Sequence, residues 1–94
     1  MTLEELRKHK PQIEAIAGKY GVRNIRVFGS VVRGEARADS DVDLLADLSH
    51  SLGWDFITAK LEIGQYLGCP VDMVDDCCID PYIAPYILHE AQPL

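Results

Sequence analysis

Three aspartates stand in stretches where strands are expected. Asp41 and Asp43 open an apolar run, and Asp72 lies inside a later one. Side chains alternate along a strand, so the carboxylates of Asp41 and Asp43 project from one face. Like charges this close raise each other's pKa and destabilise the fold unless a cation lies between them. Oxygen ligands of this kind favour Mg²⁺, and two or three such carboxylates can hold two ions across a phosphoryl group in transfer.

A glycine–serine pair, Gly29-Ser30, follows another apolar run and precedes Asp41 by ten residues. Glycine lets the backbone approach a ligand closely, and the free N–H groups of a following helical turn favour an anion. Ser30 either caps that turn or donates its hydroxyl to a phosphate oxygen. A Gly-Ser turn or an Asp-x-Asp alone is usually without function. Together they predict a nucleoside triphosphate held by backbone donors at one end and by metal-bridged carboxylates at the other.

The elements that must position these residues follow from hydrophobic periodicity and from turn residues. A helix begins at Thr2 with a capping box to Glu5, and Pro11 either kinks it or begins a second helix that ends at Gly21. Alternation predicts strands over 24–28, 41–47 and 71–75, and helical spacing predicts helices over 54–67 and 80–92. This order predicts a three-stranded sheet covered by helices and leaves open whether its strands are parallel or mixed.

Length and composition limit the protein to one small domain, residues 1–94, with 48% hydrophobic and 26% charged residues. A formal net charge of −6 argues against tight binding of a nucleic-acid duplex, so no DNA partner is expected. No apolar run is long enough to span a membrane, and the charged N-terminus lacks the core of a signal peptide. The three cysteines form neither a disulfide framework nor a zinc pattern, so we expect reduced thiols and a cytoplasmic location without a membrane partner.

The run GSVVRGEARADSDVDLL resembles the signature of the DNA polymerase beta-like nucleotidyltransferase superfamily. Its short length and the segment RGEARADSDVDLL are similar to the minimal nucleotidyltransferase antitoxins, the partners of HEPN-type ribonuclease toxins. The likeness extends from the KYGV segment through VDMV to the tail PYIAPYILHEA. Val32 departs from the commoner small alanine before Arg-Gly, a change that should affect packing rather than chemistry.

That resemblance implies a small α/β (α+β) nucleotidyltransferase fold with a short mixed sheet of about three strands flanked by helices. It implies that Gly29 and Ser30 bind phosphates and that Asp41 and Asp43 bind Mg²⁺, with two ions expected. Asp72 would join a metal and help to deprotonate the attacking hydroxyl. ATP would be the donor, and AMP would pass to a tyrosine of the cognate HEPN toxin, which is thereby neutralised.

Two other functions are compatible with the same residues. One is a non-catalytic antitoxin that blocks its partner by steric occlusion, although retention of all three acids disfavours it. The other is adenylylation of a small molecule, although enzymes of that kind carry a further domain. Arg33 either reaches a phosphate or pairs with a nearby acid such as Glu35 or Asp39, while Ser40 is expected to shape the loop.

Several apolar side chains are assigned to packing. We expect Ile57, Leu61 and Leu67 on the inner side of the 54–67 helix, and Trp54 and Phe56 in the core. The tail helix, with Tyr82, Ile83, Tyr86, Ile87 and Leu88, is expected to dock on the sheet, and the alternative is a surface for a partner protein. Cys77 and Cys78 receive no role.

Overall fold

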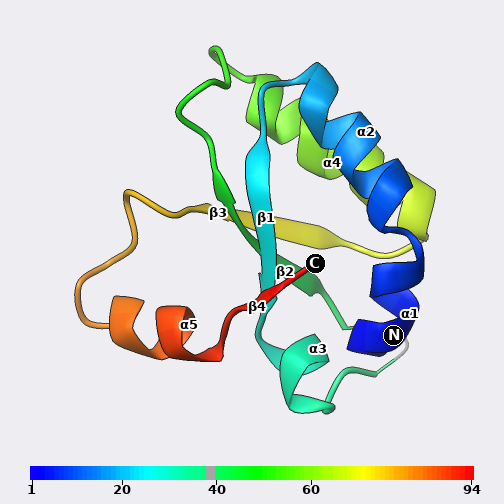
Figure 1. Ribbon diagram of the computed structural model, residues 1–94, viewed down its shortest axis with the longest axis vertical. Coiled ribbons are helices and arrows are strands. Elements are labelled where there is room, and N and C mark those ends of the chain that lie inside the picture. The colour runs from blue at the N-terminus through cyan, green and yellow to red at the C-terminus, as the bar shows by residue number, and fades with distance from the viewer. Residues whose placement is uncertain (38–39) are drawn as a thin grey trace.

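The computed structural model describes residues 1–37 and 40–94, which contain five helices and four strands (Figure 1). In chain order they are α1 (Leu3–Lys8), α2 (Lys10–Lys19), β1 (Arg23–Phe28), α3 (Ser30–Arg33), β2 (Val42–Asp47), α4 (Asp55–Leu67), β3 (Val71–Asp75), α5 (Ala84–Glu90) and β4 (Gln92–Pro93). The predicted order of elements is confirmed, with β4 as an addition.

The strands form one mixed sheet in the order β3-β2-β1-β4. β1 is antiparallel to β2 and to β4, whereas β2 and β3 are parallel and are joined through α4. β4 escaped sequence analysis because it has only two residues, and Pro93 is tolerated there because β4 lies at the edge of the sheet.

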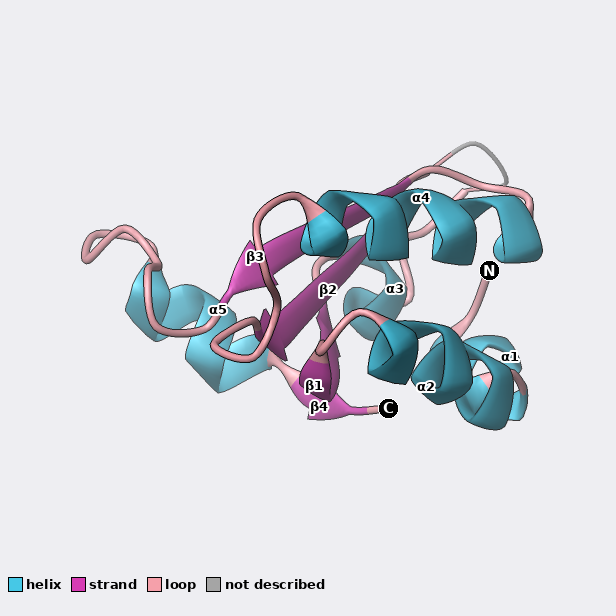
Figure 2. Ribbon diagram, turned by 90° about the horizontal axis from the view of Figure 1, so that it is seen from above, coloured by secondary structure: helices cyan, strands magenta, loops and turns pink. Residues whose placement is uncertain are grey.

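The hydrophobic core lies between the sheet and the helices α2 and α4, which pack on one of its faces (Figure 2). β2 turns Val42, Leu44 and Ala46 toward this core, and all three side chains are buried. Alternation along the strand therefore turns Asp43 to the opposite face. The helices contribute Ile13, Ala17, Ala59 and Ile63.

The helix ends follow local sequence signals. Thr2 Oγ1 accepts a hydrogen bond from the Glu5 N–H at 3.1 Å, which confirms the predicted cap of α1. Pro11 lies in the first turn of α2, so it begins a second helix rather than kinking the first. Gly68 adopts a left-handed conformation, φ 74°, and ends α4.

The packing predicted for α4 was partly wrong. Leu61 and Trp54 are 60% and 76% exposed, whereas Phe56 packs against the core as expected. The buried face of α4 is formed by Ala59, Ile63 and Gly64. Leu61 lies two residues from both Ala59 and Ile63, which places it on the opposite side of the helix.

The predicted docking of the tail helix on the sheet was also wrong. α5 buries none of its residues, and Tyr82 and Tyr86 are 89% and 76% exposed. The segment after β3 leads the chain away from the sheet, and α5 lies far from α2 and α4 (Figure 1). Within residues 1–37 and 40–94, no helix has the length and apolar character needed to cross a membrane.

Candidate active site

The turn after β1 is built around Gly29, which is buried and has φ 80° and ψ −152°. This conformation is accessible almost only to glycine. A Cβ atom at this position would overlap Oδ2 of Asp43. The turn and the Asp43 carboxylate are therefore in direct contact, although thirteen residues of sequence lie between Gly29 and Asp43.

Asp43 lies at the centre of the candidate site. In the sheet its register partners are Phe28 of β1 and Asp72 of β3. Asp41 lies just before β2 and is exposed, as is Asp72. The Oδ1 atom of Asp72 accepts a hydrogen bond from the Met73 N–H at 3.0 Å. The fold thus brings the turn and the three aspartates predicted from the sequence to one end of the sheet.

The electrostatic environment of Asp43 is predominantly negative. Partial burial raises the pKa of its carboxyl group, and the neighbouring charges of Asp72 and Asp41 raise it further. Glu90 acts in the same direction, and Arg33 partly opposes them. A carboxylate with an excess of negative neighbours is a place where a cation would stabilise the fold.

The donor set at this end of the sheet consists of carboxylate oxygens, which suit Mg²⁺. The three aspartates face one region without converging on a single point. In the described part of the chain, the one group of three ligand atoms within 4.8 Å of one another comes from Asp75, Cys77 and Cys78. The ligand atoms of the three aspartates therefore do not all lie within 4.8 Å of one another in this structure.

The cysteine group differs chemically from the aspartates. Cys77 Sγ and Cys78 Sγ lie 3.3 Å apart as free thiols. This hydrogen bond, together with Asp75, raises the pKa of Cys77 to about 11. A thiol that remains protonated at neutral pH is a poor metal ligand, so the group does not compete with the aspartates as a candidate site.

A fourth acid, Glu90 at the end of α5, reaches the Gly29 turn. Glu90 Oε1 accepts a hydrogen bond from the Gly29 N–H, and both carboxylate oxygens accept from Arg33 Nη1, at 2.9 and 3.0 Å. Arg33 Nε also donates to Glu35 Oε2 at 3.1 Å. Arg33 is thus paired with acids in this structure, which was one of its two predicted roles.

Sequence reasoning missed Glu90, because no motif or fixed spacing relates it to the glycine turn 61 residues earlier. The N-cap of α3 is Gly29 rather than Ser30, so the alternative in which Ser30 caps this turn was wrong. Ser40 Oγ accepts from the Arg37 N–H at 2.8 Å, which confirms its role in shaping the loop. Asp39, named as a possible partner of Arg33, lies outside the described residues.

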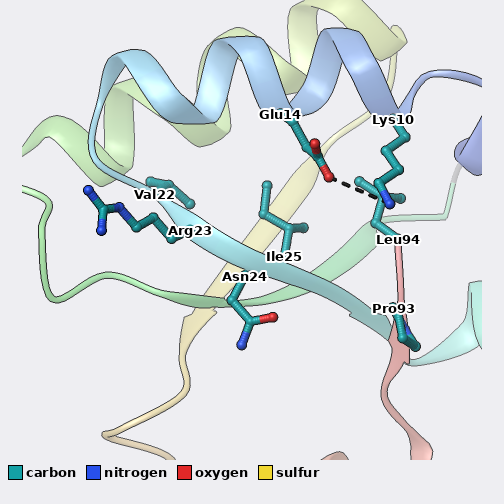
Figure 3. Close-up of a pocket in the computed structure, with 8 residues that line it drawn as sticks. All are labelled: Lys10, Glu14, Val22, Arg23, Asn24, Ile25, Pro93 and Leu94. Carbon is teal, nitrogen blue, oxygen red and sulfur yellow. Dashed lines mark ion pairs between the residues drawn. The ribbon is translucent and has the colours of Figure 1, made fainter.

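A cavity of about 390 Å³ lies elsewhere, between α2, the start of β1 and the C-terminus (Figure 3). It is lined by Lys10, Glu14, Val22, Arg23, Asn24, Ile25, Pro93 and Leu94. None of the six residues predicted for the site lines this cavity. Glu14 is the one residue lining it whose side chain is a carboxylate, and its Oε1 atom already pairs with Lys10 Nζ at 3.8 Å. We therefore place the candidate site at the open end of the sheet and not in this cavity.

Comparison with known proteins agrees with this geometry. The nucleotidyltransferase domain family matches residues 6–90. A protein adenylyltransferase, MntA of Thermococcus cleftensis, is 39% identical over 95 residues, which cover 96% of this chain and 93% of the relative.

Solved structures confirm the predicted fold class. A structure described as a candidate minimal nucleotidyltransferase superposes with a TM-score of 0.80 and 40% identity, covering 100% of this chain and 97% of that one. A crystal structure of a toxin–antitoxin with AMP-PNP shares the fold at a TM-score of 0.74 and 17% identity, covering 88% of this chain and 69% of that one.

Proposed function

Since this chain belongs to the nucleotidyltransferase domain family and is a nucleotidyltransferase, we propose that it transfers AMP from ATP to a tyrosine hydroxyl of a partner toxin. The partner proposed is a HEPN-type ribonuclease, which the modification neutralises in the cytoplasm. This is the activity that the sequence resemblance implies, and the geometry of the candidate site supports it.

One observation carries the proposal: the Gly29 turn lies against Asp43, which has Asp72 as its register partner on the next strand. Phosphoryl transfer requires donors that fix the phosphates and carboxylates that organise the reacting oxygens. A glycine turn in contact with one acid, beside a second acid on the next strand, provides both parts. A merely structural cluster of acids would be expected to carry basic partners, whereas Asp43 has mainly negative neighbours.

Asp41, Asp43 and Asp72 are the residues proposed to hold Mg²⁺. When bound there, the metal would neutralise the triphosphate and make the α-phosphorus more electrophilic. The partial burial of Asp43 and the exposure of Asp41 and Asp72 fit this assignment, because one ligand is anchored in the fold while the other two remain accessible to a substrate.

The chain's own donors are proposed to orient the other end of the nucleotide. The Gly29 N–H and the Arg33 guanidinium point to one place, as their shared contact with Glu90 demonstrates. An oxygen of the β- or γ-phosphate would take that place, and the Ser30 hydroxyl at the start of α3 would donate to the same group.

In the transfer step the tyrosine oxygen bonds to the α-phosphorus. The bond between the α-phosphorus and the oxygen that bridges it to the β-phosphorus breaks, and pyrophosphate leaves. The proton of the tyrosine hydroxyl passes to Asp72, whose exposure leaves it accessible to an acceptor. Asp43 is the less suitable base, because it is more buried and lies against the Gly29 turn.

A protein acceptor fits the architecture better than a small molecule does. The described residues of this chain offer the reacting groups at an open sheet end rather than inside an enclosed pocket, so a partner would complete the site. The Thermococcus relative is a protein adenylyltransferase and one structural neighbour is a toxin–antitoxin, and both support the same class of acceptor.

The test combines α-³²P-labelled ATP, Mg²⁺, the purified protein and the product of the neighbouring gene. Label is expected on the partner, on tyrosine, and only with an intact site. The double variant Asp41→Asn/Asp43→Asn is expected to lose transfer. The matched control is Asp47→Asn, the same isosteric change at the far end of β2, where the carboxylate accepts from the Ser49 N–H at 2.9 Å.

Undiminished labelling by the double variant would overturn the assignment of these aspartates. A stable complex without label, formed equally by wild type and double variant, would favour neutralisation by occlusion instead. Label on a small molecule but not on the partner would refute the protein acceptor.

A further inference from the structure

The carboxylate of Glu90 occupies the place that the proposed function assigns to a phosphate. It accepts from the Gly29 N–H through Oε1 and from Arg33 Nη1 through both oxygens. These donors come from the turn after β1 and from α3, whereas Glu90 comes from the last residue of α5. A long-range contact therefore closes the anion-binding end of the site.

The chemistry of this contact is that of phosphate recognition. A guanidinium binds carboxylates and phosphates alike through its fixed N–H groups, and a backbone N–H at a glycine turn donates to either anion. Two anions cannot share these donors, because their like charges would repel each other at close range. A triphosphate bound at Gly29 and Arg33 thus requires Glu90 to leave.

We infer that Glu90 is an internal competitor of the nucleotide: its carboxylate holds Gly29 and Arg33 until the triphosphate displaces it, and it thereby sets the affinity for ATP. This inference rests on the proposed function, because it takes Gly29 and Arg33 as the phosphate end.

The way in which α5 is attached supports such a displacement. None of its residues is buried, so its withdrawal exposes little apolar surface. The Glu90 side chain is 24% exposed and its partner Arg33 is 47% exposed, so the ion pair is partly screened by solvent. Glu90 also adds to the negative charge around Asp43, and its departure would relieve that repulsion.

The test measures binding of MgATP to the full chain by calorimetry, in the absence of an acceptor. Glu90→Ala and Glu90→Gln are each expected to bind MgATP about three- to tenfold more tightly than wild type, the range expected for loss of a partly exposed competing ion pair. Glu35→Gln is the matched control, because Glu35 pairs with the same arginine but does not contact Gly29. It is expected to change the dissociation constant by less than about twofold.

Hydrogen exchange of the α5 amides gives a second measurement, which removal of one negative charge would not change by itself. In the wild type, MgATP is expected to increase exchange of the α5 amides while it protects the turn at Gly29. In Glu90→Ala, α5 is expected to exchange fast already, with no further increase on binding.

The possible outcomes separate the inference from the function on which it rests. Equal affinity of wild type and Glu90 variants, or protection of α5 by MgATP, would overturn the inference and leave the proposed function intact. An equal gain in Glu35→Gln and Glu90→Gln would also overturn it, because removal of charge would then explain both. Absence of MgATP binding in all variants would refute the proposed function, and the inference would fall with it.

Discussion

Gly29→Ala tests whether the turn after β1 is as closely fitted to Asp43 as the structure indicates. Two costs arise at this position. The backbone conformation, φ 80° and ψ −152°, costs a residue with a Cβ about 1–3 kcal/mol. The new methyl group would also overlap Asp43 Oδ2, the end of a side chain that can rotate at a cost of about 0.5–1.5 kcal/mol. We expect a loss of about 2–4 kcal/mol in the free energy of unfolding.

Gly68→Ala is the matched control. Gly68 also has a positive φ, 74°, but no atom lies within 4 Å of a Cβ built there. Only the left-handed conformation is then penalised, by about 1 kcal/mol. The protein should tolerate both changes, since a chain of this length has about 5–14 kcal/mol of stability.

The assay is urea unfolding followed by circular dichroism. With an m-value of about 1.5 kcal/mol/M, the midpoint should fall by about 2 M for Gly29→Ala and by less than about 1 M for Gly68→Ala. A double-mutant cycle isolates the overlap with Asp43. In an Asp43→Ala background the Gly29→Ala penalty should shrink by about 0.5–1.5 kcal/mol, because the overlapping carboxylate is gone. Equal penalties in both backgrounds, or equal penalties at Gly29 and Gly68, would refute the reasoning.

Three further predictions concern charge. Because the pKa of Asp43 is raised, ionisation of its carboxyl group destabilises the fold. Asp43→Asn should therefore raise the urea midpoint at neutral pH. This gain should vanish as the pH falls below about 3.9, where the carboxyl group is protonated in both the folded and the unfolded chain. Mg²⁺ should raise the Tm of wild type in a scanning fluorimetry titration but leave Asp41→Asn/Asp43→Asn unchanged; an equal rise in both would contradict the site. Asp76→Asn should lower the free energy of unfolding in urea by about 1–2 kcal/mol, because Arg26, which is only 21% exposed, loses the carboxylate that lies 2.5 Å from its Nη2 atom. The control Glu14→Gln removes a charge from an exposed pair and should cost less than about 0.5 kcal/mol.

The sequence predicted the parts of the site that local spacing determines. Asp43 follows a turn signal at a fixed interval in an alternating apolar run, so its place in a strand could be predicted from periodicity. The strands that pair with it could not, and the structure supplies Phe28 and Asp72 as its register partners. Asp72 was identified in the same way, because an acid inside an apolar strand contradicts the usual strand composition. The short strand β4 lay below the length at which alternation can be recognised.

The parts that could not be predicted depend on long-range geometry. Leu61 and Trp54 were assigned inward because they are apolar, yet Ala59, Ile63 and Gly64 form the buried face of α4. The tail helix has apolar residues at helical spacing, but which surface they meet depends on where the chain leads after β3. Glu90 is the strongest case, since its partners are fixed only once α5 has brought it back to the sheet.

The charge distribution explains how an acidic chain can be expected to bind a polyanion. The net charge is −6, and at the candidate site the charges of Asp41, Asp72 and Glu90 act on Asp43 and are opposed there by Arg33. A free triphosphate approaching this end of the sheet meets mainly repulsion. Binding therefore requires two changes together: cations at the aspartates and withdrawal of Glu90 from the glycine turn. It follows that ATP without Mg²⁺ should bind more weakly to this protein than MgATP does, and that the difference should persist in Glu90→Ala, because that variant frees the phosphate donors but leaves the three aspartates uncompensated.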